Sequence, residues 1–537
     1  MRLSGAVLFV GFAALCASAL HAQVPPSSPP AAQPSAVPTA VQPSALPSAT
    51  PTQPPIVVTP ASADVPVGST QVLHVMSVLG SIAVRVQNAA IVDAAVDQPA
   101  QTITLSGKAP GATALVITDQ RGLSATIPVR VAYNAGSIAD AASIRITGDP
   151  ASAQFVKEEA VAAARSLAAP RPGAQVVAST DEILLSQPLA QDDVTAVSVP
   201  VLLQGEQYFT VEGTTHVRVE NLAAPKIDPI SLMVSDFPER LTANGELFAS
   251  DLTRAQPSRF LYFHYNPAGE PDRRIVLRAE NRSTEPAIVQ FISGIGGPSS
   301  NEMAVGHDAS RRFLERLVQN EGRIIVIPGK GAPNIAAQLL PAKMVVCNVL
   351  QLRVLNGSVV HLTLFAQNAA DSPEEPLANA TLLQGDRPHA RGVYGIPEFH
   401  YSRLWNVDDP YLELPLGQIP LPEKLNGLAL SGDYGVVQSF VIKVQNPGGR
   451  PQPIAIYENP RGGRATGTYL IDGTLIQSHQ VPPFSRYKVR QYVVPARGFV
   501  RVTIVTMPEG GSSYPLRLVF APDDGSVAPG APGSPVY

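Results

Sequence analysis

The sequence predicts a mainly β, multidomain protein, and three observations carry this prediction. The chain has 537 residues, which exceeds what one hydrophobic core normally organises. Charged residues make up only 15%, whereas there are 53 prolines and 41 glycines, a composition that favours strands joined by turns over long helices. Short β-branched segments alternate between apolar and polar residues throughout. Together these features predict Ig-like β-sandwiches, two of them an internal repeat, with one small α+β module.

The N-terminus predicts a signal peptide over residues 1–22. Arg2 supplies the positive start, and Ala6–Leu15 form an apolar run too short to span a bilayer. Small residues end at Ala19 or Ala22, where cleavage would occur. A lipoprotein signal with Cys16 as the lipidated residue is the alternative. No later segment is apolar for long enough to form a transmembrane helix.

Two segments have the composition of disorder. Residues 23–55 are rich in Pro, Ala, Ser and Thr and carry no charge, which predicts an extended spacer. Residues 523–537 form a Gly/Pro/Ser-rich tail. A spacer directly after a signal peptide would hold the folded part away from a membrane or wall.

Residues 56–134 predict the first folded unit, a small β domain. In "SIAVRV" and "IPVRV" the apolar residues share one face at period two. The segments "DVPVGSTQVLHV", "AVRVQNAAIVDAAV" and "ITLSGKAPGATALVITDQRG" resemble the N-terminal domain of pilus-formation and type II/III secretion proteins. The resemblance is carried by Gly68, Ser69, Asn88, Ile91, Val92, Asp93, Gly107, Pro110, Gly111, Thr113, Asp119 and Gly122. It implies a role in pilus or secretion-system assembly; a bacterial Ig-like surface domain is the weaker alternative.

Residues 137–223 read as strand, helix and strands, which predicts an α+β module. Asp149 or Ser152 is expected to cap the helix, and "PRPG" at 170–173 to end it. The apolar stripe of this helix is Phe155, Val156, Ala160, Ala163, Ala164 and Leu167.

The remaining chain predicts two related sandwiches, over residues 226–368 and 389–522. Four pairs of segments occur in the same order, starting at Pro238 and Pro422, Ile275 and Phe440, Ile324 and Gln491, and Asn356 and Gly510. The first copy carries an insertion that predicts a short helix capped by Asp308 or Ser310 and ended by Gly322. Its buried stripe is Phe313, Leu314, Leu317 and Val318, with Arg311, Arg312 and Arg316 facing solvent.

The sequence contains two motifs that resemble a phosphate-binding loop and a secretin segment, but both are incomplete. The pair Gly107-Lys108 lacks a glycine five positions earlier, is followed by Ala109 in place of a hydroxyl residue, and has Pro110 where a backbone donor is needed. The segment from Pro415 to Pro420 resembles part of a secretin motif, with one residue missing and no counterpart in the other repeat copy.

No catalytic motif, metal site or cofactor site is predicted. The histidines are dispersed, and paired acids lack calcium-loop spacing. Cys347 lies in an apolar run and is expected to be a buried hydrophobe. Because the net charge is −4 and no basic stripe exists, nucleic acid is excluded as a partner.

The predicted function is therefore non-catalytic: an exported protein of the periplasm or cell surface that contacts other envelope, pilus or secretion proteins. One alternative is an adhesin or glycan-binding protein, for which the only dense aromatic cluster would supply the binding surface. That cluster is Tyr394, Phe399, Tyr401, Trp405 and Tyr411. A further alternative is an enzyme on a β-sandwich, which convergent carboxylates in a cleft would favour.

Overall fold

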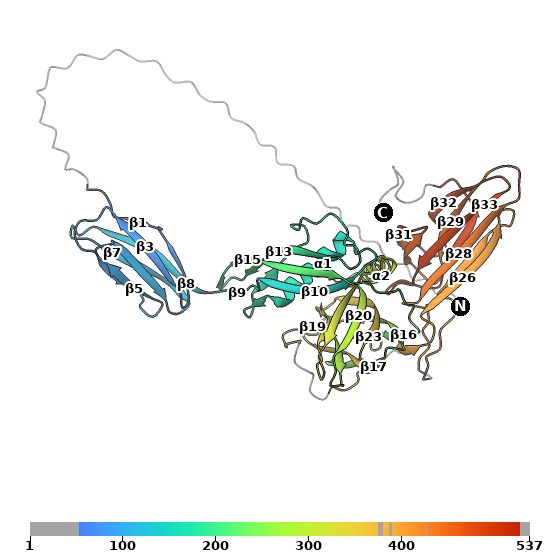
Figure 1. Ribbon diagram of the computed structural model, residues 1–537, viewed down its shortest axis with the longest axis horizontal. Helices are drawn as coiled ribbons and strands as arrows, with labels where there is room; N and C mark the ends of the chain where they lie inside the picture. The colour runs from blue at the N-terminus through green and yellow to red at the C-terminus, as the bar shows by residue number, and fades with distance from the viewer. Residues whose placement is uncertain (1–52, 374–379, 386–388, 426, 527–537) are drawn as a thin grey trace, which may run out of the picture. The chain divides into compact units, whose positions relative to one another are not determined.

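The computed structural model describes residues 53–373, 380–385, 389–425 and 427–526 (Figure 1). The predicted signal peptide (1–22), residues 23–52 of the predicted linker and residues 527–537 of the predicted tail lie outside the described residues. The predicted mainly β, multidomain fold with β-sandwiches is confirmed, because strands dominate and the described residues contain two α-helices. Neither of these helices has the length and apolar character that crossing a membrane requires.

The first domain is a sandwich of two sheets around one core. One sheet has the order β1-β3-β6-β5, with bounds Val57–Thr59, Thr70–Met76, Thr102–Gly107 and Val92–Asp97. The other contains β2 (Ala63–Pro66), β4 (Ala83–Val86), β7 (Gly111–Thr118) and β8 (Ser124–Asn134). Alternate residues such as Leu73, Val75, Ile103 and Leu105 are buried between the sheets. The Gly107-Lys108 pair lies where β6 turns into β7, and Lys108 forms an exposed ion pair with Asp93 at 3.1 Å.

The second unit packs one helix on a sheet. Helix α1 (Ala153–Leu167) contacts β10 (Ala141–Thr147), β13 (Val194–Gln204) and β15 (Val211–Asn221). Ser152 caps α1, since its hydroxyl accepts from the Phe155 amide. The short strands are β9 (Gly136–Ser137), β11 (Ala169–Pro170), β12 (Gln175–Val177) and β14 (Tyr208–Phe209), of which β14 pairs with β8 of the first domain.

The sheet of the second unit continues into the next domain. Strand β10 pairs antiparallel with β21 (Gly322–Ile327), which gives a ten-stranded sheet of order β12-β13-β15-β10-β21-β20-β23-β18-β16-β25. The further strands are β16 (Ser231–Ser235), β18 (Ser258–Tyr265), β20 (Ala287–Ser299), β23 (Val345–Asn356) and β25 (Arg391–Tyr394).

Strands β16 to β24 form one sandwich and β26 to β34 form another. The second sheet of the first sandwich has the order β17-β24-β19-β22, with bounds Gly245–Leu252, Val360–Asn368, Arg273–Asn281 and Asn334–Leu340. The second sandwich has the sheets β26-β28-β33-β30-β31 and β27-β34-β29-β32. The strands of the first sheet are β26 (Glu398–Asn406), β28 (Val437–Asn446), β33 (Gly498–Thr506), β30 (Ala465–Ile471) and β31 (Thr474–Val481). Those of the second sheet are β27 (Leu412–Leu416), β34 (Leu516–Pro522), β29 (Gln452–Pro460) and β32 (Tyr487–Val494).

Each strand number in the second sandwich is ten higher than its equivalent in the first, so the topology repeats in full over the described strands. The strand order is that of a jelly roll, with one extra strand (β16 or β26) added parallel to β18 or β28. This differs from the Ig-like order. Alternation in a sequence shows which residues face a core but not which strands are neighbours, so it could not distinguish the two sandwich types.

The register of the repeat also needs correction. Only the pair starting at Asn356 and Gly510 leads into equivalent strands, β24 and β34. The hairpin between β28 and β29 corresponds to the one between β18 and β19, so the true counterpart of Asn446-Pro447 is Asn266-Pro267. Likewise Pro341-Ala342-Lys343 corresponds to Pro495-Ala496-Arg497, and both basic residues have positive φ, 65° and 52°. The predicted alignment paired similar strand–turn segments that lie one strand apart in the two copies.

Helix α2 (Glu302–Val318) is inserted between β20 and β21 and lies against β20 and β23 (Figure 1). Asn301 caps it, not Asp308 or Ser310, because the Asn301 side chain accepts from the Ala304 amide at 3.2 Å. A Cβ at Gly294 or Gly296 of β20 would lie 2.2 and 1.9 Å from carbonyl oxygens of α2, so glycine is required for this close packing. Arg316 was expected in solvent but is partly covered, since it pairs with Glu158 of α1 at 2.6 Å.

Candidate functional site

The two jelly rolls and α2 share one apolar core, which we call the junction core. The first jelly roll contributes Leu261, Phe263, Cys347 and Val349, α2 contributes Phe313 and Leu314, and the second contributes Val437, Leu470 and Met507. All of these side chains are buried. Cys347 is among them, as expected of a small hydrophobe, and burial raises the pKa of its thiol far above the usual range. Burial of this much apolar surface joins the two jelly rolls.

A fully buried arginine lies beside the junction core. Arg259 on β18 donates to a carboxylate oxygen of Glu398 at 2.5 Å and to the carbonyl of Pro397 at 2.6 Å. It also donates to Gln351 on β23 at 3.0 Å. Burial lowers the pKa of Arg259, and the Glu398 carboxylate partly offsets this. Arg259 therefore connects the first jelly roll to strand β26 of the second through charge-assisted hydrogen bonds.

A cavity of about 170 Å³, lined by both polar and apolar residues, adjoins this arginine pair. We call it the junction cavity. Its walls come from the segment before β16, the end of α2 and both jelly rolls. The polar residues that line it are Lys226, Asp228, Gln290, Asn320, Gln351, Arg353, Glu398, His400 and Ser439.

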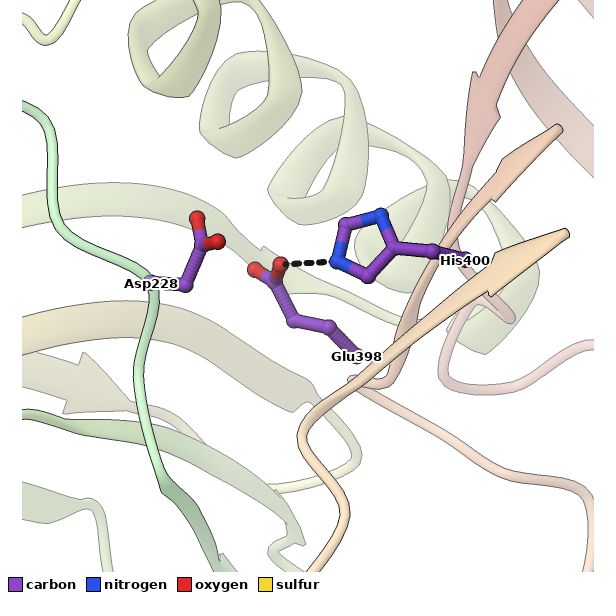
Figure 2. Close-up of side chains that lie close together, drawn as sticks. All are labelled: Asp228, Glu398 and His400. Carbon is purple, nitrogen blue, oxygen red and sulfur yellow. Dashed lines mark ion pairs between the residues drawn. The ribbon is translucent and has the colours of Figure 1, made fainter. Parts of the chain in front are cut away.

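Asp228, Glu398 and His400 gather at the junction cavity (Figure 2). One ligand atom of each lies within 4.8 Å of the others, and His400 Nε2 is 3.4 Å from Glu398 Oε2. The residue types suit a divalent metal. However, the Glu398 charge is already matched by Arg259, and Lys226 and Arg353 line the same cavity. These cations oppose a second positive charge, so the cluster fits an ion-pair network better than a metal centre.

Arg353 on β23 has a different environment from Arg259. Its Nε donates to Gln290, which donates to Thr147 at 2.6 Å, and Thr147 donates to the Asn320 carbonyl at 2.7 Å. This chain of hydrogen bonds fixes the guanidinium, yet Nη1 and Nη2 have no hydrogen-bond partner among the described residues. Arg353 is 8% exposed, and burial lowers its pKa. Arg353 thus lines the junction cavity, while its two terminal nitrogens have almost no accessible surface.

A second group of titratable residues surrounds His389. Its Nδ1 is 3.3 Å from Asp236 and its Nε2 is 3.3 Å from Glu239. Burial raises the pKa of Asp236 to about 6, although the His389 contact opposes that shift. Asp236, Glu239, Glu302 and His389 line a cavity of about 230 Å³. We call this the acidic cleft.

A third group is buried where α2 meets the second jelly roll. Glu509 is fully buried and accepts from Thr466 at 2.5 Å, and it contacts His307 of α2 at 2.9 Å. Burial opposes protonation of His307, but its contact with Glu509 prevails and raises the His307 pKa. Nearby Glu458 is also fully buried, and burial raises its pKa to about 7.

The five predicted aromatic residues do not form one exposed platform. Tyr394 is fully buried in the junction core, and Trp405 is 2% exposed in the core of the second jelly roll. Phe399, Tyr401 and Phe440 pack on one another with ring centroids 5.9 and 5.2 Å apart, and Tyr411 alone is largely exposed. Phe399, Tyr401 and Trp405 lie on one face of β26, whereas Tyr394 belongs to β25 and Tyr411 lies between β26 and β27.

Sequence reasoning missed the residues that the structure brings together. Arg259 and Arg353 lie in apolar strands, and Asp228 and His400 are far apart in the chain. The tripeptide Phe-His-Tyr occurs at 263–265 and at 399–401, but its two histidines have different environments. His264 is fully buried, contacts Ser235 and Pro238, and has its pKa lowered to about 4 by burial, whereas His400 is exposed.

Comparison with known protein families gives one match. Residues 59–132 match the family described as "Pilus formation protein N terminal region". This segment comprises 74 of the 537 residues and confirms the resemblance predicted for residues 56–134. No curated protein matches the chain.

Solved structures resemble the chain only weakly. They include a tri-modular GH5 endo-β-1,4-glucanase from Bacillus licheniformis (12% identity, 31% of this chain, TM-score 0.13) and Drosophila N-cadherin EC1-4 (10%, 32%, 0.13). Another is the M60 catalytic domain with two CBM51 domains of Clostridium perfringens ZmpB (10%, 87%, 0.15). The chain spans 38%, 50% and 54% of these three chains, and no function follows from such scores.

Proposed function

We propose that this chain is a non-catalytic, exported envelope protein that acts through protein–protein contacts in pilus or secretion-system assembly. The observation that carries the proposal is the family match over residues 59–132. The family name concerns pilus formation, and its domain here is a complete two-sheet sandwich with its own core. The other domains would then hold or extend this contact domain.

The first domain offers a surface suited to such a contact. Val57, Val72 and Met76 point away from the core on the sheet β1-β3-β6-β5 and are 42%, 45% and 48% exposed. Val57 lies directly opposite Met76 across the two strands. We call these three residues the Val72 face. Exposed apolar residues gathered on one sheet face are typical of interaction sites.

A complementation experiment tests the proposal. The gene would be deleted in the bacterium that encodes it and restored as wild type or with Val72→Asp and Met76→Asp together. We expect the double variant to fold, because both side chains are exposed, and to lose pilus or secretion-system assembly. Val493→Asp, at a 65% exposed position of the second jelly roll, is the matched control and should restore assembly. Normal assembly in the deletion strain would overturn the proposal.

The acidic cleft favours a second candidate, an enzyme on the sandwich scaffold. Asp236 has a raised pKa and neighbours Glu239 and His389, as a general acid beside a second carboxylate would. This candidate predicts that the full chain releases reducing ends from soluble polysaccharides, and that Asp236→Asn abolishes the release. If the wild type releases none from a broad panel, the candidate fails.

A further inference from the structure

We propose that strand β26 pairs with β26 of a second copy of this chain, antiparallel and centred on Leu404. In the first jelly roll the equivalent edge is covered, because β25 pairs antiparallel with β16. In the second jelly roll β26 is an edge strand, and β28 is its one partner among the described strands. The two copies of the fold therefore differ at this edge, which is open in the second copy over the described residues.

The strand itself carries few of the features that protect an edge. Edge strands are commonly short, bulged, or interrupted by proline or lysine, which discourages pairing with another chain. Strand β26 has nine residues in unbroken register with β28, and it contains neither proline nor lysine. Ser402, Arg403 and Leu404 are exposed, and Leu404 is the most exposed apolar residue of the strand, at 56%. Such an edge is a template for a further strand.

The backbone of β26 directs three residues of its C-terminal half to the open edge. The Pro397 carbonyl accepts from an amide at the start of β28 at 3.1 Å, and the Val407 amide donates to a carbonyl of β28 at 2.9 Å. Residues 397 and 407 thus face β28. Because amide and carbonyl directions alternate along a strand, Ser402, Leu404 and Asn406 direct theirs away from β28. These groups are positioned to pair with a second strand.

The exposed half of β26 is complementary to itself. An antiparallel pair centred on Leu404 places this side chain opposite its own copy, which removes both from water, and places Ser402 opposite Asn406. Arg403 then lies opposite Trp405, so like charges are not directly opposed. A pair centred on Arg403 would oppose two arginines. Leu404 is therefore the favoured centre, and the contact is isologous, which gives a closed dimer.

Charges around β26 agree with this arrangement. The exposed acids Asp408 and Asp409 follow the strand, and antiparallel pairing brings them toward the end of the other strand that carries His400. Lys443 lies beside Leu404 on β28. Three strand spacings separate it from Lys443 of the second copy, about 14 Å. That distance exceeds the screening length of about 8 Å at physiological salt, so repulsion between the two lysines is weak.

Sedimentation velocity of the full chain over a dilution series tests the proposal. The wild type should form dimers, and Leu404→Lys should weaken dimerisation by about tenfold or more, because two ammonium groups would face each other. Leu404→Asp should have the same effect. An equimolar mixture of these two variants should dimerise again, since each ammonium then faces a carboxylate. Val493→Lys, at a 65% exposed position of β32, is the matched control and should dimerise like the wild type.

Cysteine crosslinking tests where the contact lies. Leu404→Cys should form a disulfide-linked dimer under mild oxidation, because directly opposed residues of an antiparallel pair can have Cα atoms about 5.5 Å apart. Phe499→Cys, which is 57% exposed on β33 of the same sheet, should not, and the buried Cys347 does not compete. The proposal is overturned if the wild type stays monomeric, if dimers persist in Leu404→Lys, if the mixture stays monomeric, or if Leu404→Cys is not crosslinked.

Discussion

Arg259 and Arg353 project from neighbouring strands of one sheet, and both are buried, but only Arg259 has a carboxylate partner. The difference separates two roles. Arg259 is structural, because Glu398 and the Pro397 carbonyl bind it to the second jelly roll. Arg353 lines a cavity, but its two terminal nitrogens are buried without a hydrogen-bond partner among the described residues.

The Arg259–Glu398 pair predicts a specific pattern of destabilisation. Arg259→Met should lower the free energy of unfolding by about 3–5 kcal/mol, because Glu398 is left poorly solvated without its cation. The double change Arg259→Met with Glu398→Gln should recover part of that loss. Urea denaturation of the three proteins measures both effects. A single variant as stable as the wild type, or no recovery in the double variant, would show that the pair is unimportant.

Glu458 predicts a pH dependence of stability. Its pKa is raised from 4.5 to about 7 by burial, so the folded chain keeps this proton while the unfolded chain releases it. The free energy of unfolding therefore falls as the pH rises through about 4.5 to 7. Glu458→Gln should remove this dependence and stabilise the second jelly roll at pH 8 by roughly 3 kcal/mol, the linkage value of such a shift.

Urea denaturation at pH 5 and pH 8 checks this prediction. Glu206→Gln is the matched control, because Glu206 is exposed, and its curves should follow the wild type at both pH values. A Glu458→Gln protein less stable than the wild type at pH 8 would mean that the carboxylate is needed in its charged form.

At this scale the sequence predicted little of the site. A charged residue within a strand is usually exposed, so Arg259 and Arg353 gave no sign of burial. The aromatic cluster was predicted from closeness in sequence, but Tyr394 and Trp405 are buried in two different cores and Tyr411 is exposed in a loop. Only tertiary packing brings Asp228 to Glu398 and His400.

Among the elements, the turn between the third and fourth strands of each jelly roll is repeated in chemistry as well as position. Asn266 donates from its side chain to the carbonyls of Pro271 and Leu340, and Asn446 donates to those of Arg450 and Val494. In both copies the amide thus joins the hairpin to the end of another strand. The motif Asn-Pro-x-Gly-x-Pro in both copies was a sequence signal for the correct register.

This repeated turn predicts similar losses in the two copies. Asn266→Ala and Asn446→Ala should each destabilise their own jelly roll by about 2–3 kcal/mol, since two buried carbonyls lose a donor. Asn356→Ala, at an exposed position, should change stability little. Thermal unfolding of the three variants provides the comparison, and a neutral Asn446→Ala would contradict the proposed role of the amide.

Helix α2 predicts a steric effect at one glycine. A Cβ on Gly306 would lie 1.7 Å from the backbone oxygen of Gly510, so α2 and the second jelly roll would have to separate. Gly306→Ala should cost about 1–3 kcal/mol through overpacking. Gly449→Ala has nothing within 4 Å of its Cβ and should be tolerated. Equal melting temperatures for the two variants would argue against tight packing of α2.

The elements were more predictable than the site, because strands and helices are set by local periodicity. The helix stripes were recognised in part, because Leu167 and Val318 at their ends are 49% and 38% exposed. Ser152, one of the two predicted caps, does cap α1. The cap of α2 was misplaced because several polar residues precede its apolar stripe, and only Asn301 meets a free amide.

For the whole molecule, duplication and sheet continuation give the described chain its organisation. The repeat could be detected from similar segments, but its jelly-roll order and the pairing of β10 with β21 depend on contacts between distant segments. The first domain was recognised from sequence because its turns require glycine, proline and aspartate at particular spacings. The family match over residues 59–132 confirms the resemblance.

The most direct test of the proposed assembly role is photo-crosslinking in living cells of the bacterium that encodes the chain. A photoreactive amino acid would replace Val72, and in a control protein it would replace Val493, which is also exposed. The proposed function predicts that position 72 crosslinks to a component of a pilus or secretion system and that position 493 does not. No crosslink from position 72, or the same products from both positions, would contradict it.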